Sequence, residues 1–257
     1  MESKILFTGT SSGRTSLTRH HSSFLIYTQN GIHLVDCGDG ISRALLLQNI
    51  DITTLSSIII SHFHADHLCG LPLLLTQMKM RKRTKEIKIF LFEGEQNNLL
   101  NFIRSTYLFI NRLPYKVDVI GYDADKKFFP DESLSVIPAA NSHLEKYRGA
   151  SPDGSLSFYC ASFLFEINGK RVHYSGDIGN PGDLDLFITS EPDILITEFA
   201  HIKAEDLFAF AKQFPGRIYI THYADEDAES LKIQMRGTPI ESAAQIKILT
   251  DGDIIKL

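Results

Sequence analysis

The stretch LSSIIISHFHADH, residues 55–67, joins an apolar run to three histidines and an aspartate. Its three consecutive isoleucines predict a buried strand that ends where the histidines begin. Because alternate residues of an extended chain point to the same side, His62 and His64 can face one metal ion. A turn into a helix would bring Asp66 and His67 toward a second ion. Imidazole and carboxylate are the usual zinc ligands other than thiolate, so the stretch predicts a metal site at a strand end.

Three further polar residues directly follow apolar runs later in the chain: His143, Asp177 and His222. Open α/β architectures place their functional sites just beyond the carboxyl ends of strands. Taken alone, each residue could be an ordinary loop residue. Together with the histidine cluster, they become candidate metal ligands.

Apolar and helical patterns alternate along the whole chain, with hairpin signals at Asn30-Gly31 and Asn168-Gly169. Strands are expected at 4–8, 23–28, 32–36, 55–61, 87–92, 116–120, 134–138, 157–167, 171–175, 193–198, 217–221, 246–249 and 253–256. Helices are expected at 41–49, 66–80, 96–111 and 204–213. Hairpins in both halves with helices between them favour two packed sheets with helices outside, in one domain over residues 1–257.

The composition is that of an ordinary globular protein. The chain of 257 residues is 43% hydrophobic and 22% charged, which predicts a real core and argues against disorder. Its net charge of -5 provides no global basic field, so any nucleic acid must be held by a local patch.

The cysteines and the amino terminus indicate a reducing, cytoplasmic setting with no membrane partner. Cys37, Cys69 and Cys160 are scattered and odd in number, which does not suggest a disulfide framework. No export signal is recognisable, and no apolar run approaches the ~20 residues that span a bilayer. Cys69 lies beside the histidine cluster, but its place on the expected helix favours a core position over a ligand role.

One basic run stands out in this acidic chain. It is the kind of run that usually forms a solvated helix end, and a nucleic-acid patch is the alternative. Its members are Lys79, Arg81, Lys82, Arg83, Lys85 and Lys88.

The series of candidate ligands resembles the motif set of the metallo-β-lactamase superfamily in order and spacing. Asp36, in the segment LVDCGDG, also matches that family's preceding motif. The resemblance implies an α/β fold of the four-layer αββα sandwich type. It further implies that Asp36 orients a ligand histidine by hydrogen bond. By the family's pattern one ion takes His62, His64 and His143, the other takes Asp66, His67 and His222, and Asp177 bridges the two.

This resemblance predicts a cytoplasmic metal-dependent hydrolase with two Zn²⁺ ions, although Mn²⁺ or Fe would fit the same ligands. Two zincs about 4 Å apart lower the pKa of a bridging water and clamp both oxygens of an in-line displacement. The expected reaction is therefore hydrolysis of a phosphodiester by a metal-bridging hydroxide, in RNA or in a small nucleotide. Asp66 is expected to take part in catalysis as well as in metal binding.

Within the superfamily the chain resembles the ribonuclease Z branch, the tRNA 3′-end endonucleases. The polar segment after the first strand carries this likeness and suggests substrate contacts by Thr10, Ser11 and Arg19. Glu198 and His201 match a pair that acts on the leaving group in that branch, and such a pair could supply a general acid.

The chain departs from that branch where the long tRNA-binding arm would lie. The arm is inserted between the residues that correspond to His143 and Asp177, and here that interval is short. The segment between Glu198 and His201 is also reduced. A small or single-stranded phosphodiester is therefore the expected substrate, and tRNA processing is not.

Other functions remain open from the sequence. A lactone, thioester or carboxylic-ester hydrolase would use the same metals, and a non-catalytic or redox metal-binding protein is a further alternative. A β-lactamase is disfavoured because its second metal typically takes a cysteine. Gly9-Thr-Ser-Ser-Gly13 formally matches a serine nucleophile elbow, but no helical pattern follows it. A homodimer is compatible with all of these functions.

Overall fold

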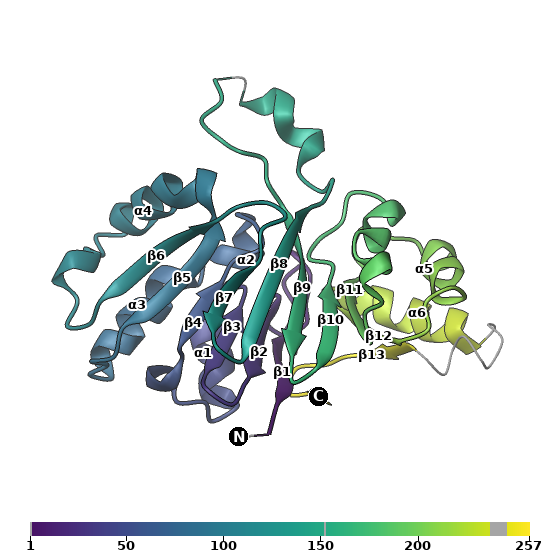
Figure 1. Cartoon of the computed structure of the whole chain (residues 1–257), viewed down its shortest axis with the longest axis horizontal. Helices are drawn as coiled ribbons and strands as arrows, with labels where there is room; N and C mark the ends of the chain where they lie inside the picture. Colours follow the sequence, from purple (N-terminus) through teal and green to yellow (C-terminus); the bar gives the residue numbers. More distant parts are fainter. Residues whose placement is uncertain (1, 152, 237–245) are drawn as a thin grey trace.

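Two seven-stranded mixed sheets form the centre of the molecule in the computed structural model, which describes residues 2–151, 153–236 and 246–257 (Figure 1). The first sheet has the order β14-β1-β2-β3-β4-β5-β6. Its strands are β1 (Lys4–Gly9), β2 (Ser23–Tyr27), β3 (Ile32–Val35), β4 (Ser57–Ile59), β5 (Ile87–Phe92), β6 (Val117–Tyr122) and β14 (Ile254–Lys256).

The second sheet has the order β13-β12-β11-β10-β9-β8-β7. Its strands are β7 (Phe128–Asp131), β8 (Leu134–Ala140), β9 (Ala161–Ile167), β10 (Lys170–Tyr174), β11 (Ile194–Glu198), β12 (Arg217–Thr221) and β13 (Ile246–Ile248). In both sheets one part is antiparallel and the other parallel, and the parallel strands begin at β3 and at β10.

Helices cover the outer face of each sheet. The first sheet is covered by α1 (Ile41–Leu47), α2 (Ala65–Leu68), α3 (Leu71–Met80) and α4 (Gln96–Ser105), the second by α5 (Ala204–Ala211) and α6 (Asp225–Arg236). Short 3₁₀ turns are η1 (Ile52–Thr54), η2 (Glu93–Glu95), η3 (Ile110–Arg112), η4 (Glu145–Ala150), η5 (Pro181–Asp185) and η6 (Ile188–Ser190). This is the four-layer αββα sandwich that the sequence predicted.

Aromatic side chains fill the space between the two sheets. Phe24 of the first sheet lies edge-on to Tyr174 of the second, with ring centroids 5.0 Å apart, and also approaches Phe165. All three are buried. Burying each such side chain contributes roughly 1.5–3 kcal/mol, so this layer fixes how the sheets, and the residues at their edges, meet.

A short segment stands out from the body of the molecule beside the strand ends. We call it the projection and define it as residues 144–151 and 153–159, between β8 and β9 (Figure 1). The structure thus places a small lobe, rather than a long arm, in the interval between His143 and Asp177.

Several predicted boundaries were wrong for local reasons. The helix expected over 96–111 ends at Ser105, because Tyr107 adopts a left-handed conformation (φ 60°) that interrupts the helix. The strand expected from 157 begins only at Ala161, since Phe158 is also left-handed (φ 52°). Strand β7 and helix α6 were not predicted. Cys69, expected in the core, is exposed at the end of α2.

Among the described residues, none of the helices combines the length and the apolar character needed to cross a bilayer.

Candidate metal centre

The strand directions explain why distant residues meet at one edge. Strands β10, β11 and β12 are parallel, so their carboxyl ends, which lead to Asp177, Glu198 and His222, lie side by side. Strand β8 runs in the same direction as β10, because each is antiparallel to β9, and this brings His143 to the same edge. In the first sheet, parallel β4 leads to His62 there.

The structure gathers the seven predicted ligands into two groups that share Asp177. One group is His62, His64, His143 and Asp177, and the other is Asp66, His67, Asp177 and His222. Within each group, one candidate donor atom per residue lies within 4.8 Å of all the others. These are the memberships that the sequence resemblance implied.

Asp177 lies between the groups and directs its two oxygens toward both. Its Oδ1 is 3.2 Å from Nε2 of His67, and its Oδ2 is 3.3 Å from Nε2 of His222. The same Oδ2 is 3.7 Å from Nε2 of His143 and 3.8 Å from Nε2 of His62. A carboxylate in this position can bridge two ions.

Three of the histidines are fixed through Nδ1, so that Nε2 faces the centre. The oxygen partners are Ser61 Oγ for His62 (3.0 Å), Asp36 Oδ2 for His67 (2.8 Å) and the Ile178 carbonyl for His143 (3.3 Å). Such contacts set the tautomer and the ring orientation of metal-binding histidines.

The residues fit a metal because buried polar atoms at the centre lack any other partner. Nε2 of His62, Nε2 of His67 and Oδ1 of Asp177 are buried and make no hydrogen bond, although the last two atoms lie 3.2 Å apart. Leaving such atoms unpaired is costly, and coordination would satisfy them. Burial lowers the pKa of His143 to about 4 and holds the pKa of His62 well below its usual range. Both rings are therefore neutral near pH 7, as coordination requires.

Asp36 makes the hydrogen bond to a candidate ligand that the resemblance implied. Besides His67, it accepts hydrogen bonds from the amide and hydroxyl of Ser61 and from the hydroxyl of Tyr174. Its left-handed conformation (φ 58°) turns the chain at the end of β3. Asp36 thereby connects the first sheet, the second sheet and the centre.

Glu198 and His201 form a pair beside the centre. The Glu198 carboxylate accepts the His201 backbone N–H at 2.8 Å and lies 3.1 Å from His201 Nδ1. The His201 ring is 4.7 Å from that of His143, between centroids, and its side chain is partly exposed. The hydrogen bond to Glu198 raises the pKa of His201, which suits a proton donor.

The three expected substrate contacts are engaged within the protein, with Thr10 and Ser11 buried and Arg19 partly buried. The Thr10 hydroxyl donates to Asp251, and the Ser11 hydroxyl donates to the Arg14 carbonyl. The Arg19 guanidinium donates to the carbonyls of Thr10 and Tyr223, each at 2.8 Å, and to Asp225. These contacts favour a role in holding the loop in place.

Sequence analysis missed Asp183, which ties two ligand-bearing loops together. Its carboxylate accepts hydrogen bonds from Ser142, next to His143, and from Gly179, which follows Asp177 closely. The signal was present in the segment Asn180-Pro-Gly-Asp183, which forms a capping box at η5.

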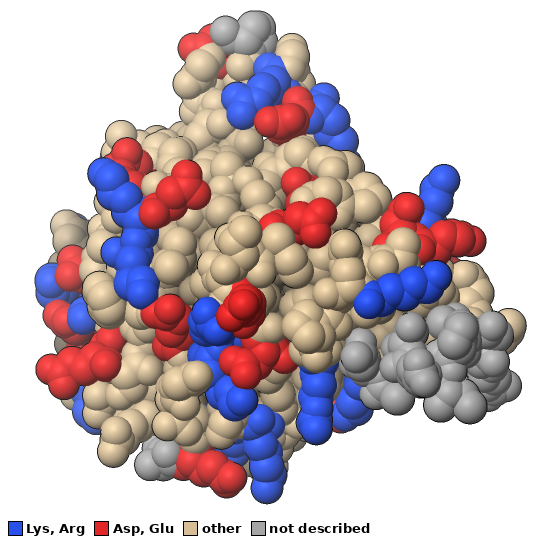
Figure 2. All heavy atoms as spheres, turned by 45° about the vertical axis from the view of Figure 1, so that its right-hand side comes forward, with Lys and Arg blue, Asp and Glu red and all other residues tan. Residues whose placement is uncertain are grey.

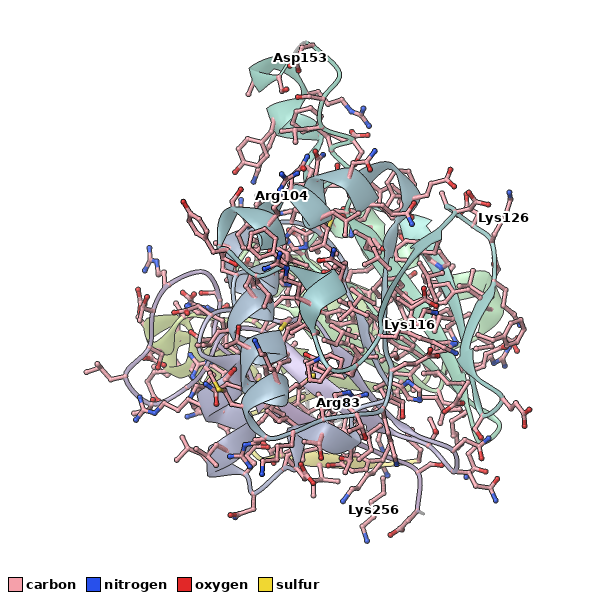
Figure 3. The ribbon with its side chains drawn as sticks, turned by 90° about the vertical axis from the view of Figure 1, so that its left-hand side faces the viewer. Arg83, Arg104, Lys116, Lys126, Asp153 and Lys256 are labelled. Carbon is pink, nitrogen blue, oxygen red and sulfur yellow. The ribbon has the colours of Figure 1, made fainter. Side chains whose placement is uncertain are left out.

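The basic run lies away from the centre, and one of its members is structural. Arg83 is 2% exposed, and its guanidinium donates to carbonyls that include those of Thr53 and Leu55, each at 2.7 Å. It therefore cannot join a nucleic-acid patch. Figure 3 shows Arg83 toward the end of the molecule marked by Lys256, whereas Asp153 marks the tip of the projection. Helix α3, roughly 15 Å long, lies between α2, which carries Asp66 and His67, and the residues of the run that follow Met80.

Comparison with known proteins agrees with this geometry. The family model described as anti-Pycsar protein Apyc1 matches residues 3–238. The chain is 30% identical over 140 residues to the ribonuclease Z of Methanocaldococcus jannaschii, and 40% identical over 89 residues to that of Pseudomonas putida. These matches cover 54% and 34% of this chain but only 44% and 28% of the two relatives.

Solved structures share the fold over essentially the whole chain. The metallo-β-lactamase fold protein YhfI from Bacillus subtilis superposes with a TM-score of 0.76 at 16% identity, covering 100% of both chains. The short form of human tRNase Z gives 0.71 at 19% identity, covering 98% of each chain. A diphosphatase of the PhnP family gives 0.71 at 15% identity, covering 99% of this chain and 98% of the other. Together with the ribonuclease Z relatives matched by sequence, these structures confirm the predicted superfamily and its ribonuclease Z-like branch.

Proposed function

Since the chain belongs to the family of anti-Pycsar protein Apyc1, within the metallo-β-lactamase superfamily, we propose that it is a two-metal hydrolase of small phosphodiesters. The observation that carries the proposal is the pair of donor groups that share Asp177. The likeness to ribonuclease Z proteins favours phosphodiester chemistry over hydrolysis of a carboxylic ester or lactone.

The donor set suits Zn²⁺, with Mn²⁺ or Fe as alternatives. Two such ions, when bound, supply an activated water and neutralise the charge that develops on the phosphoryl group. The protein's own contribution is to hold neutral imidazoles and one shared carboxylate in fixed orientations. Asp36, Ser61 and Asp183 maintain those orientations through their hydrogen bonds.

His201 is the proposed proton donor to the departing oxygen. It lies beside His143, and its ring centroid is 6.2 Å from that of His222, so it faces both donor groups. Glu198 fixes its Nδ1 and stabilises its charged form, which leaves Nε2 available toward the substrate. A positioned acid of this kind contributes roughly 10²–10⁴ to the rate.

The surface supports a small substrate rather than a folded RNA. Figure 2 shows positive and negative side chains interspersed on the face it presents, without a continuous basic track. The exposed members of the basic run lie beyond α3, and the projection is too short to be a long arm.

A substrate panel on metal-verified protein tests the proposal. We expect hydrolysis of bis(p-nitrophenyl) phosphate and of cyclic nucleotides, with much lower kcat/KM values for lactones and thioesters. A kcat/KM for any lactone or thioester above that for every diester would overturn the proposal.

A further inference from the structure

Each donor group at the candidate metal centre takes its side chains from both sheets. In the first group, His62 follows β4 of the first sheet, and His143 follows β8 of the second. In the second group, His67 lies on α2, which comes after β4, and His222 follows β12 of the second sheet. The donor atoms of a group can therefore meet on one ion only if the two sheets are held in a fixed relation near this edge.

A buried hydrogen bond between side chains joins the two sheets next to the centre. Tyr174 is the last residue of β10, three positions before Asp177, and its hydroxyl donates to Oδ2 of Asp36 at 3.0 Å. Asp36 directly follows β3 of the first sheet. Tyr174 is 1% exposed and Asp36 is 0% exposed, so water has no access to replace this bond.

The Asp36 carboxylate that accepts this bond also holds a candidate ligand. Its Oδ2 accepts from Nδ1 of His67 at 2.8 Å and from the hydroxyl of Ser61 at 2.9 Å. Its Oδ1 accepts from the backbone N–H of Ser61 at 2.8 Å. A carboxylate with this many donors around it has a fixed orientation, and hydrogen bonds to a charged acceptor are the strong ones. His67 and Tyr174 are thus held at the same oxygen.

The direction of the hydrogen bonds extends this control to the other donor group. The Ser61 hydroxyl has a single hydrogen, and its oxygen lies 3.0 Å from Nδ1 of His62 as well as 2.9 Å from Asp36. Because an ionised carboxylate can only accept, this hydrogen goes to Asp36, and Ser61 accepts the Nδ1–H of His62. Nε2 of His62 then keeps its lone pair toward the centre, as metal coordination requires.

We propose that Tyr174 is a positioning residue for both metal ions. By linking Asp36 to the second sheet, it holds His67 in place relative to the donors on that sheet. Through Ser61 it does the same, less directly, for His62. The inference rests on the two-metal centre of the proposed function, but it does not depend on the identity of the substrate.

Zinc affinity tests this role without any measurement of catalysis. Tyr174→Phe keeps the aromatic ring that packs against Phe24 and removes only the hydroxyl. Zn²⁺ titrated into metal-free protein against a chromophoric chelator should bind about 10- to 100-fold more weakly, because the loss of a group that orients a ligand typically costs that much. The loss should be larger for the ion of the His67 group than for the ion of the His62 group.

Tyr115→Phe is the matched control for the loss of a buried hydroxyl. Tyr115 is 4% exposed, and its hydroxyl donates to the Leu75 carbonyl. It lies just before the amino end of β6, which is parallel to β4 and β5, and thus at the edge of the sheet opposite the centre. Tyr115→Phe should leave the affinity for both zinc ions unchanged.

Ser61→Ala tests the connection to the other group. It removes the acceptor of the His62 Nδ1–H, while Asp36 keeps its bonds from the Ser61 backbone, His67 and Tyr174. We therefore expect the opposite pattern from Tyr174→Phe, with the larger loss for the ion of the His62 group. A larger loss for the ion of the His67 group would overturn the role of Ser61 as the connection.

The outcomes separate this inference from the proposed function. Unchanged zinc affinity in Tyr174→Phe, or an equal loss in Tyr115→Phe, would overturn the positioning role and leave the phosphodiesterase standing. The expected losses of zinc in a protein that hydrolyses no diester would support the positioning role and overturn only the proposed function.

If Tyr174→Phe does not fold, proton NMR of the wild-type, zinc-loaded protein decides. A slowly exchanging Tyr174 hydroxyl proton with a cross-peak to the Nδ1–H of His67 would support the proposal, because both protons lie on the same oxygen of Asp36. A Tyr174 hydroxyl proton that exchanges rapidly with solvent would overturn it.

Discussion

Asp177 is the residue on which both donor groups depend, because it contributes an oxygen to each. We predict about two metal ions per chain in the wild-type protein. Asp177→Ala should lose most of both, and His64→Ala should lose the ion of its own group. Elemental analysis of purified protein measures this, with His201→Ala as the control because His201 belongs to neither group. Full activity with a single bound ion would exclude the two-metal mechanism.

The Glu198 and His201 pair allows a prediction that separates chemistry from metal binding. Glu198→Gln and His201→Ala should each lower kcat by roughly 10²–10⁴ on a diester with a poor leaving group, with metal content intact. On bis(p-nitrophenyl) phosphate the loss should be small, because p-nitrophenolate departs without a proton. Equal losses on both substrates would mean that the pair does not act as a general acid.

At the residue scale, the sequence predicted the candidate ligands, whose positions depend on strand ends. It did not predict side-chain roles that depend on hydrogen bonds to distant residues. The candidate ligands follow apolar runs, so their meeting at one edge could be inferred from strand direction. The burial of Arg83 could not be inferred, because its guanidinium donates to carbonyls 28 and 30 positions earlier in the chain as well as to that of nearby Lys85. Arg19 is engaged in the same way, through Tyr223 and Asp225.

Among the secondary-structure elements, β3 and β7 are joined by a partly buried hydrogen bond between side chains at the end away from the centre. Nε2 of His33, on β3, lies 2.7 Å from Oδ2 of Asp131 at the end of β7. Partial burial opposes ionisation of Asp131, but hydrogen bonds from His33 and Thr28 lower its pKa to about 2.

This lowered pKa predicts how stability depends on pH. Because the folded pKa lies below the ordinary value of 3.8, the contribution of Asp131 is present above about pH 4 and is lost as the pH falls toward 2. Asp131→Asn should therefore lower the free energy of unfolding by about 1–2 kcal/mol at pH 7, with a smaller difference near pH 3. Urea titrations at both values measure it. Glu132→Gln, at the exposed neighbour, should change little, and a difference for Asp131→Asn that grows on acidification would contradict the assignment.

Most of these elements were predictable from apolar periodicity, and the exceptions share a cause. Strand β7 is an edge strand that pairs irregularly with β8, and α6 is polar enough to resemble a loop. The early end of α4 and the late start of β9 depend on Tyr107 and Phe158, which are left-handed. Tyrosine and phenylalanine seldom adopt that conformation, so the residue type gives no sign of it. Only the tertiary surroundings decide such positions.

For the whole molecule, the prediction concerns substrate size. Remote contacts make a large substrate preferable to a small one, and the described surface offers few of them near the centre. We expect a kcat/KM for small diesters at least equal to that for precursor tRNA. Neutralising the exposed Arg81, Lys82 and Lys85 should leave hydrolysis of small diesters nearly unchanged. A kcat/KM for precursor tRNA larger by several orders of magnitude would falsify this expectation.

The pairing of β14 with β1 has a consequence for how the protein is made. Asp251, just before β14, accepts hydrogen bonds from the backbone N–H groups of Thr10 and His20. These bonds anchor the loop that reaches Asp66 at Gly13. Thr10 leaves the ribosome 241 residues before Asp251, so the nascent chain carries this loop without its anchor while that interval is synthesised. We therefore expect metal to load at the Asp66 side of the centre only after Asp251 has emerged and anchored the loop.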